Sequence, residues 1–346
     1  MRTLGEAIYS DIEENEYLNE LYLGIYLAYS EHLFKNRSIS SISNINFSHA
    51  LRFADILSKS THISNADKHK NIAQEMVALT AEIHSDLDKL LYVIGSVLTN
   101  TNNYRGLAIC APTYHSADVI TQLYEGYVRD NMRIPYSDKN YFFRSQREIY
   151  SNLDKKYYSY SGPTSMGKSF VMRSFLKEHI LDGRNENFVI VVPTKALINE
   201  MSSKIIEDLT DELEKKNYRI VTSAGAMSLQ QAHNFIFILT PERLLYLLLD
   251  KPSLNISYLF IDEAHKISSK DKRSPFYYKV VDMISRTMPD THIYFSSPNI
   301  PNPEVYLRLI STTQKTEDKT TSSYTPVSQF KYIINLINGH SFAYNN

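Results

Sequence analysis

The sequence predicts an α/β fold with a parallel, doubly wound sheet, preceded by a mainly α-helical region. From about residue 136 onward, short β-rich runs alternate with runs of helical period. The short runs are four to six residues long and almost continuously apolar, as strands are when both faces of a parallel sheet are covered. The helical runs between them would form right-handed crossovers. We expect strands at residues 157–160, 188–192, 219–222, 235–239, 258–261 and 292–295.

The first 135 residues predict helices, because apolar residues recur there at helical spacing. Polar breaks rich in Ser and Asn separate the helices. Residues 106–112 suit either a short strand or the start of a buried helix, and three histidines suit surface or core positions better than ligand positions: His32, His49 and His62. We interpret residues 1–135 as an accessory or partner-binding domain, with helices at 18–34, 50–57, 72–83, 87–98 and 116–129.

The remainder of the chain predicts an α/β domain and a short further part. Residues 136–310 would form the α/β domain, with ligands at the carboxyl ends of its strands. Residues 311–323 are polar and predict a linker. Residues 329–337 predict one strand, and one strand cannot make a domain. We therefore interpret 311–346 as a linker followed by the beginning of a further domain.

Composition narrows the functional classes. Lys plus Arg number 37 and Asp plus Glu number 38, a net charge of −1, so any nucleic-acid contact would be a local groove and not a globally basic surface. The single cysteine, Cys110, excludes an intrachain disulfide and a cysteine zinc site. The N-terminus lacks an apolar signal core, and no apolar run is long enough for a membrane span. We expect a soluble cytoplasmic protein with no membrane contact.

The strongest motif matches the phosphate-loop pattern G-x-x-x-x-G-K-[ST] at every required position. Its glycines let backbone N–H groups approach an anion, and the following helix points its N-terminus at the phosphates. Lys168 would reach the β- and γ-phosphates, and the Ser169 hydroxyl would bind Mg²⁺. A chance match is disfavoured because a β-prone run precedes the loop and a helical run follows it. The residues concerned are Gly162, Pro163, Thr164, Ser165, Met166, Gly167, Lys168 and Ser169.

A second acidic motif follows the hydrophobic run that ends at Ile261. Asp262 would hold Mg²⁺, through water, and Glu263 would orient or deprotonate an attacking water. Alone, the motif is also compatible with a strand that happens to end in an acidic turn. The phosphate loop upstream makes the catalytic interpretation the better one, so we expect Lys168, Asp262 and Glu263 to form the reactive centre.

The run Asp262-Glu263-Ala264-His265 resembles the DEAH form of the Walker B motif of superfamily 2 helicases. The resemblance covers roughly residues 140–310 and implies the first RecA-like ATPase domain, with ATP and Mg²⁺ as cofactors and DNA or RNA as partner. Residues 144–148 resemble the Q motif, whose glutamine, here Gln146, would read adenine, with Phe142 or Phe143 stacking on the base. The alternative for Gln146 is an ordinary solvated helix residue.

Two further stretches resemble motifs Ia and Ib, which grip the nucleic-acid backbone in that family. Both also suit ordinary helix starts, with a cap residue and, in motif Ib, a proline in the first turn. The two interpretations are compatible, because helix N-termini bind phosphates. Residues 222–225 would add a backbone contact. The motif residues are Pro193, Thr194 and Lys195 in Ia, and Thr240, Pro241 and Arg243 in Ib.

Residues 295–304 resemble motif III but depart from its pattern. Ser296 matches the family's serine, whereas Ser297 replaces alanine and Pro298 replaces threonine. Proline removes a hydroxyl and a backbone donor. In the family this motif couples ATP hydrolysis to strand movement through the DEAH histidine, here His265. The change therefore puts the coupling by His265 and Ser296 in doubt more than hydrolysis itself.

The amino-acid sequences of the phosphate loop and of residues 297–304 are similar to those of bacterial helicases of phage-defence systems, such as the Hachiman helicase subunit. The resemblance implies that a second RecA-like domain begins near Thr325 and is cut off at Asn346. Because that domain supplies arginine fingers, we expect this chain to bind ATP weakly and to hydrolyse it very slowly. Two alternatives are an ATP-responsive interaction protein and a signalling P-loop ATPase, the latter disfavoured by the ordered motif series.

Overall fold

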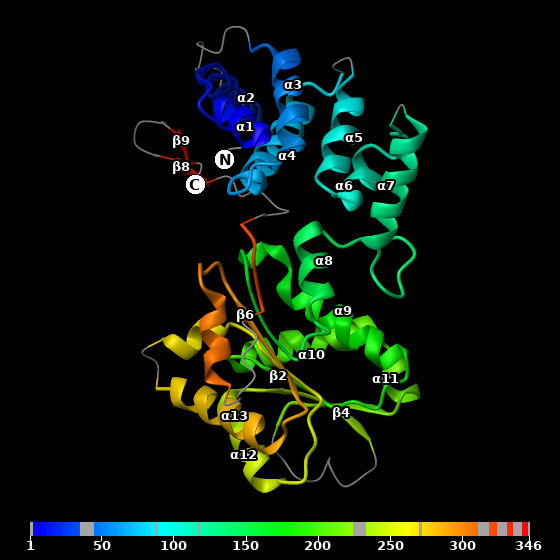
Figure 1. The fold of residues 1–346 in the computed structure, drawn as a ribbon, viewed down its shortest axis with the longest axis vertical. Helices are drawn as coiled ribbons and strands as arrows, with labels where there is room; N and C mark the ends of the chain where they lie inside the picture. The colour runs from blue at the N-terminus through cyan, green and yellow to red at the C-terminus, as the bar shows by residue number, and fades with distance from the viewer. Residues whose placement is uncertain are drawn as a thin grey trace. The chain divides into compact units, whose positions relative to one another are not determined.

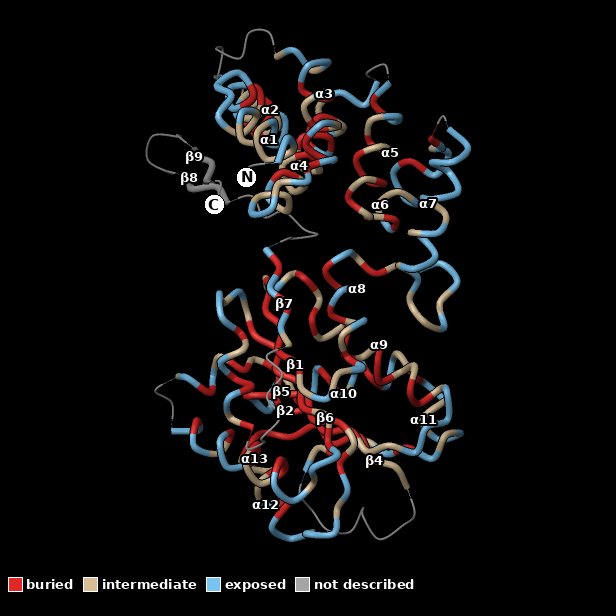
Figure 2. The backbone as a smooth tube through the Cα atoms, viewed as in Figure 1, coloured by how far each residue is buried: buried red, intermediate tan, exposed pale blue. Residues whose placement is uncertain are grey.

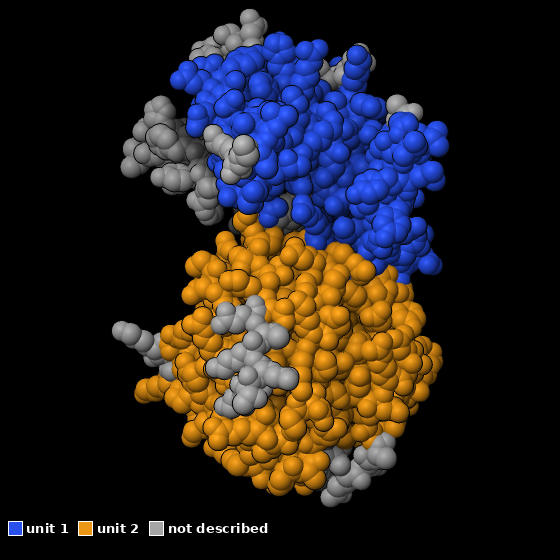
Figure 3. Space-filling view, in the orientation of Figure 1, with its two compact units in different colours: residues 1–133, 137–144, 324–346 blue, residues 134–136, 145–323 orange. Residues whose placement is uncertain are grey.

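The computed structural model describes residues 3–34, 45–86, 89–116, 118–223, 233–269, 272–310 and 318–323, and the backbone of 331–334 and 341–344. The chain divides into two compact units (Figure 3). Unit 1 comprises residues 1–133, 137–144 and 324–346, and unit 2 comprises residues 134–136 and 145–323. Each unit is described by itself below.

Unit 1 is helical, as expected for the first part of the chain. Residues 106–112, which suited either a strand or a helix, belong to a helix up to Cys110. Polar side chains cap the first turn of several helices. Thr3 and Glu6 form a capping box at α1, and the Asp118 side chain accepts the Thr121 N–H at α7. The helices are α1 (Leu4–Glu13), α2 (Glu16–Phe34), α3 (Phe47–Ser58), α4 (Ala66–Ile83), α5 (Leu90–Asn100), α6 (Tyr104–Cys110) and α7 (Val119–Asn131).

The core of unit 1 is formed where the apolar stripes of α2, α3, α4 and α5 meet (Figure 2). Its most buried members come from all four helices: Ile25, Ala54, Leu57, Ala73, Met76 and Val97. The strand expected within 329–337 is present as β8 (Lys331–Ile334). It pairs antiparallel with β9 (Ser341–Tyr344), a strand that we did not predict.

Unit 2 contains the sheet whose strands β2, β4 and β6 are labelled in Figure 1. It has seven strands in the order β3-β4-β2-β5-β6-β1-β7, and every pairing in it is parallel. All the strands expected from the short apolar runs are present, so the parallel sheet is confirmed. The strands are β1 (Tyr157–Ser161), β2 (Phe188–Val191), β3 (Tyr218–Val221), β4 (Asn234–Leu239), β5 (Tyr258–Ile261), β6 (His292–Ser297) and β7 (Lys319–Thr321).

The prediction of a linker at 311–323 is wrong for the last part of that range. Residues 319–321 form strand β7 beside β1, with the Ser159 N–H donating to Asp318 O and the Ser322 N–H donating to Ser161 O, both at 3.1 Å. These bonds use backbone groups only, so polar side chains do not prevent them, and short polar strands are typical of sheet edges. Residues 311–317 lie outside the described residues.

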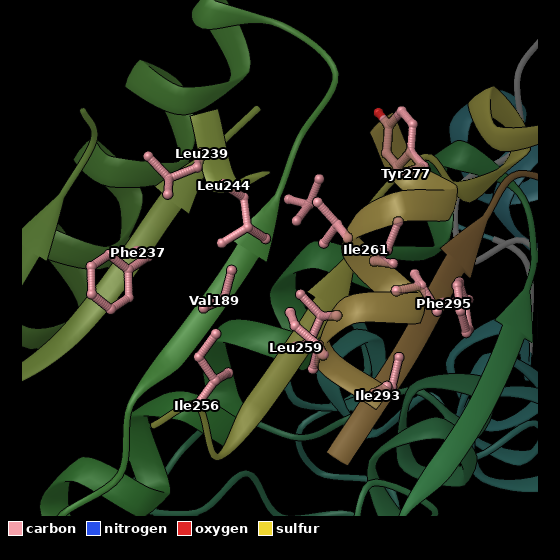
Figure 4. Close-up of a cluster of buried hydrophobic side chains, with 14 of the residues drawn as sticks. Val189, Phe237, Leu239, Leu244, Ile256, Leu259, Ile261, Tyr277, Ile293 and Phe295 are labelled. Atoms are coloured by element: carbon pink, nitrogen blue, oxygen red, sulfur yellow. The ribbon is translucent and has the colours of Figure 1, made fainter. Parts of the chain in front are cut away.

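Helices cover both faces of the sheet, as a doubly wound fold requires. One set of alternate strand residues, including Val189, Phe237, Leu259 and Ile293, packs with helices α12 (Pro241–Asp250) and α13 (Ser274–Thr287) (Figure 4). The other set faces α9 (Lys168–Leu181), where the Phe175 ring centroid lies 5.2 Å from that of Tyr258 and 6.1 Å from that of Phe260. Side chains on both faces of the sheet are buried, so a ligand would bind at the carboxyl ends of the strands.

The other segments of unit 2 connect these layers. They are α8 (Arg144–Ser151, whose first residue is assigned to unit 1), η1 (Thr164–Met166), α10 (Lys195–Leu209), α11 (Glu212–Lys215), η3 (Ala264–Ser268) and η4 (Pro303–Leu309). Among the helices of the described residues, none has the length and apolarity that a membrane crossing needs.

Candidate functional site

The phosphate-loop motif lies between strand β1 and helix α9, as its pattern predicts. Strand β1 ends at Ser161, residues 164–166 form the short η1 turn, and α9 begins at Lys168. Gly167 has φ +80°, in the left-handed region where a side chain is strained. The loop therefore leads from the carboxyl end of β1 directly to the N-terminus of α9, a position that favours an anion.

Gln146 supports this loop from helix α8. Its side-chain Nε2 donates to Met166 O at 2.8 Å, and the residue is buried. A Cβ atom on Gly167 would lie 2.7 Å from the same Nε2, so the second motif glycine leaves room for the glutamine. Gln146 is thus not an ordinary solvated helix residue. Its reading of adenine, and stacking by the buried Phe142 or the half-buried Phe143, stay predictions.

Lys168 is buried within its own loop. Its Nζ donates to Gly162 O at 2.8 Å and to Pro163 O at 3.0 Å. Burial lowers the pKa of Lys168, and the nearby carboxylates of Asp262 and Glu263 oppose that shift. The ammonium group is therefore held at the loop by weak neutral acceptors, a position from which a strongly anionic ligand would draw it by a larger Coulomb energy.

Asp262 follows the last residue of β5 and reaches the same edge of the sheet. Its Oδ2 lies 3.5 Å from the Ser169 hydroxyl, so the structure brings together the two predicted Mg²⁺ ligands. Burial raises the pKa of Asp262, the Glu263 charge adds to the rise, and the Ser296 hydroxyl and Lys168 oppose it. A buried carboxylate beside a second carboxylate is a group that a bound cation would stabilise.

Glu263 stands next to Asp262 in a strained backbone conformation. Its φ is +55°, its N–H donates to Asp262 Oδ1 at 3.0 Å, and its side chain remains partly exposed. His265 Nδ1 lies 3.2 Å from Glu263 Oε2. Strain of this kind, of order 1–3 kcal/mol, persists where the surroundings impose it and clusters at functional sites. The geometry leaves Glu263 accessible beside the buried Asp262 and the half-buried Ser169, the two predicted Mg²⁺ ligands.

The two predicted coupling residues face different carboxylates. Ser296, buried near the end of β6, faces Asp262, whereas His265 faces Glu263. Their joint role in coupling stays a prediction.

Ser161, which we did not predict, ties β1 to the loop after β6. Its hydroxyl lies 2.9 Å from Pro298 O and 3.0 Å from Ile300 O, and it accepts the Ile300 N–H at 2.7 Å. The signal that the sequence offered was its place directly before the phosphate loop.

The residues of motifs Ia and Ib lie at the starts of two helices. In Ia, Thr194 caps α10 by accepting the Leu197 N–H at 3.3 Å, and Thr194 and Lys195 are exposed while Pro193 is buried. In Ib, Thr240 and Pro241 are buried at the start of α12.

Arg243, the charged residue of motif Ib, donates to Thr222 O at 2.7 Å, so its guanidinium binds the protein backbone. Of the segment 222–225, residues 224 and 225 lie outside the described residues. Contact of these groups with a nucleic acid stays a prediction. Within the described ranges, no group of three or more His, Cys, Asp or Glu side chains is arranged to hold a metal ion.

Comparison with known proteins agrees with this geometry. Residues 143–317, just over half of the chain, match the DEAD/DEAH box helicase family. The chain therefore belongs to the DEAD/DEAH box helicase family. No curated protein matches it.

Solved structures similar to the chain include three helicases. The DUF1998 helicase MrfA bound to DNA is 17% identical, with TM-score 0.40 and coverage of 53% of this chain and 28% of that one. The DEAD-box helicase Mss116 bound to ssRNA and UDP-BeF is 15% identical, with TM-score 0.41 and coverage of 52% and 38%. The Mycobacterium smegmatis helicase Lhr bound to ssDNA and AMP-PNP is 17% identical, with TM-score 0.42 and coverage of 51% and 25%. The matched region thus spans between a quarter and two fifths of each of these longer chains.

Proposed function

We propose that this chain belongs to an ATP-dependent superfamily 2 helicase or translocase that acts on DNA or RNA. The observation that carries the proposal is the juxtaposition of Lys168, Ser169, Asp262 and Glu263 at the carboxyl edge of one parallel sheet. This is the donor set that Mg²⁺-dependent phosphoryl transfer requires: a cation for the phosphates, a hydroxyl and carboxylate for Mg²⁺, and a carboxylate for water.

The residues present fit ATP and Mg²⁺. Mg²⁺ is commonly held by one or two carboxylates together with phosphate oxygens and water, and Ser169 and Asp262 supply two protein groups for such a shell. Lys168 would leave the Gly162 and Pro163 carbonyls for the phosphates. Glu263 would accept a proton from the attacking water. Mg²⁺ would supply charge neutralisation at the phosphates.

Two substitutions test these roles. Lys168→Ala should abolish binding of a fluorescent ATP analogue, because the ammonium group buried at the loop is lost. Glu263→Gln should retain binding and stop phosphate release, because the amide cannot take the water's proton. Glu207→Gln, the same change on the exposed surface of α10, is the matched control and should leave both measurements unchanged. In a chain that carries a second RecA-like domain, turnover by Glu263→Gln at the wild-type rate would show that the water-activating role is wrong.

Slow hydrolysis by this chain alone is part of the proposal. Arginine fingers are worth about 10³–10⁵ in rate, and the family expectation places them in a second RecA-like domain. The measurement is the ATPase rate of this chain, with and without single-stranded DNA, beside a chain that carries a second RecA-like domain. Unaided turnover at the rate of the longer chain would contradict the expectation of slow hydrolysis.

A cytoplasmic antiphage role is a further proposal. It is supported by the resemblance of the phosphate-loop sequence and of residues 297–304 to those of phage-defence helicases.

An ATP-responsive interaction protein is a second candidate, and helix α7 favours it. Val119, Ile120, Leu123, Tyr124 and Tyr127 lie on one side of this helix and are each about two-thirds or more exposed. Large exposed apolar patches often mark protein contacts. Capture of a protein partner that depends on ATP, without binding to nucleic acid, would favour this function. Salt-dependent binding of single-stranded DNA or RNA would favour the helicase.

A further inference from the structure

Arg273, which no sequence motif contains, joins the segments that resemble motifs Ia and Ib. Its Nη1 donates to Pro193 O at 2.5 Å, and its Nε lies 3.0 Å from Glu242 Oε1. Pro193 comes directly before the cap of α10, and Glu242 lies in the first turn of α12. One guanidinium group therefore holds the starts of two helices that are far apart in the sequence.

These two helix starts lie at one edge of the sheet. Strands β2 and β4 are parallel neighbours, with Val191 beside Leu239, and each is followed within a few residues by its helix. Arg273 anchors α12 to the segment after β2, because it contacts both Glu242 and Pro193 O. On its other side, Arg243 donates to Thr222 O at 2.7 Å and anchors α12 to the end of β3. The start of α12 is thus tied to the ends of both strands that flank β4.

Helix starts placed in this way suit a polyanionic strand. The first N–H groups of a helix are unpaired and carry partial positive charge, which favours phosphate groups. The exposed Thr194 and Lys195 stand at the start of α10. Phosphates on one strand have a fixed spacing, so their joint binding requires that the two helix starts keep a fixed separation.

We propose that Arg273 is a positioning residue, which fixes the starts of α10 and α12 as one binding surface for the sugar–phosphate backbone of a nucleic-acid strand. This role rests on the proposed function and deepens it. Arg273 acts through Pro193 and Glu242 and does not itself contact a phosphate.

The segment that carries Arg273 is also bonded to the turn after the DEAH motif. The hydroxyl of the next residue, Ser274, lies 3.1 Å from Lys266 O and 2.7 Å from Ser269 O. The Lys266 N–H in turn donates to Glu263 O at 2.9 Å. A loss of positioning should therefore raise the nucleic-acid concentration that half-stimulates ATP hydrolysis, and leave the maximal rate unchanged.

The test uses binding of a fluorescent single-stranded oligothymidylate over a range of salt concentrations. Arg273→Ala should weaken binding about tenfold, the loss expected when hydrogen bonds of a charged group are removed. The slope of log affinity against log salt should stay unchanged, whereas a direct phosphate contact would lower it by about 1. A lower slope would overturn the positioning role. Arg286→Ala, on the exposed surface of α13, removes the same charge and should change nothing.

Glu242→Gln separates positioning from simple charge. Removing a negative charge near a polyanion should strengthen binding if only net charge matters. If Glu242 acts by holding Arg273, the same substitution should weaken binding. The double variant should then bind no more weakly than Arg273→Ala, because Arg273→Ala has already broken the ion pair that Glu242→Gln would remove. Stronger binding by Glu242→Gln would overturn the inference.

Hydrogen exchange keeps the inference distinct from the proposed function. Arg273→Ala should speed amide exchange in the first turns of α10 and α12, and Arg286→Ala should not. Failure of the wild-type chain to bind the oligonucleotide would contradict the proposed function, but the exchange measurement would still test whether Arg273 positions the two helices. Unchanged exchange in both turns would overturn the inference.

Discussion

Two glycines, Gly167 and Gly126, differ in whether their position requires glycine. Gly167 in the phosphate loop has φ +80°, and an added Cβ would lie 2.7 Å from Gln146 Nε2. Gly126 lies within helix α7, and an added Cβ would meet no heavy atom within 4 Å. The first glycine is required by its conformation and its neighbour, whereas the second only adds conformational entropy to the unfolded chain.

Substitution by alanine should therefore have opposite effects at these positions. Gly167→Ala should destabilise unit 2 by about 1–2 kcal/mol, the cost of a left-handed residue, and should weaken ATP binding. Gly126→Ala should stabilise unit 1 by about 0.5–1 kcal/mol. Urea denaturation of both variants checks the signs. A stabilising Gly167→Ala would show that the loop readily adopts another conformation.

The ionisation of Tyr104 makes the stability of unit 1 depend on pH in the alkaline range. Burial, with a smaller contribution from the Glu125 charge, raises the pKa of Tyr104 to about 12 from an ordinary 10.0. Between these two values the unfolded chain releases the hydroxyl proton while the folded chain keeps it. Stability therefore falls as the pH rises through this window.

Replacing this hydroxyl should flatten the pH dependence. The wild type should lose up to about 2.7 kcal/mol more than Tyr104→Phe between pH 10 and 12, because each pH unit between the two pKa values costs about 1.36 kcal/mol. Urea denaturation at both ends of that range measures the difference. Tyr127→Phe removes an exposed hydroxyl and is the matched control. Parallel curves for Tyr104→Phe and the wild type would contradict the prediction.

At the level of elements, β1 is the strand on which several segments converge. Its two neighbours in the sheet are β6 and β7, and the phosphate loop follows it. Its buried serines bind the segment after β6: Ser159 donates to Pro303 O at 2.7 Å, and Ser161 binds Pro298 and Ile300. The segment that resembles motif III is therefore held by the strand that leads into the phosphate-loop motif.

Loss of the Ser161 hydroxyl should release this segment. Ser161→Ala leaves the part-buried N–H of Ile300 without that acceptor, so unit 2 should lose about 1–3 kcal/mol. Thermal denaturation measures the loss. Ser151→Ala, at an exposed hydroxyl that binds its own helix, should stay within about 0.5 kcal/mol of wild type. Equal effects of the two substitutions would show that the Ser161 contacts are dispensable.

For the whole molecule, the main feature is that each unit has its own core. The buried cluster of unit 1 comes mainly from α2, α3, α4 and α5, and that of unit 2 from the sheet with α12 and α13. Units with separate cores need not unfold together. A ligand that binds one folded unit stabilises that unit by mass action.

Calorimetry should therefore show two transitions. ATP with Mg²⁺ at about 100 times its Kd should stabilise only the unit 2 transition, by about 2.7 kcal/mol. Lys168→Ala should remove that shift and leave the unit 1 transition unchanged. A single transition that shifts as a whole would show that the units unfold as one.

Local pattern was sufficient for much of this protein. Continuous apolar runs predicted six of the strands, because a strand covered on both faces must be apolar on both. The phosphate loop and Asp262-Glu263 were predictable because their chemistry needs fixed residue types at fixed spacing. The polar run 319–321 predicted a linker and forms a strand, since an edge strand pairs through its backbone and needs no apolar side chains.

By itself, the sequence determined the class of fold and the positions of most helices and strands, and it predicted the candidate nucleotide-site residues from Lys168 to Glu263. The tertiary structure alone decided the strand order, the pairing of β7 with β1, the contacts of Ser161 and the contact of Arg273 with Pro193 O. The physical reason is that these contacts end on backbone carbonyl and N–H groups. Every residue carries a backbone carbonyl, so no side-chain pattern marks which one a distant residue will bind.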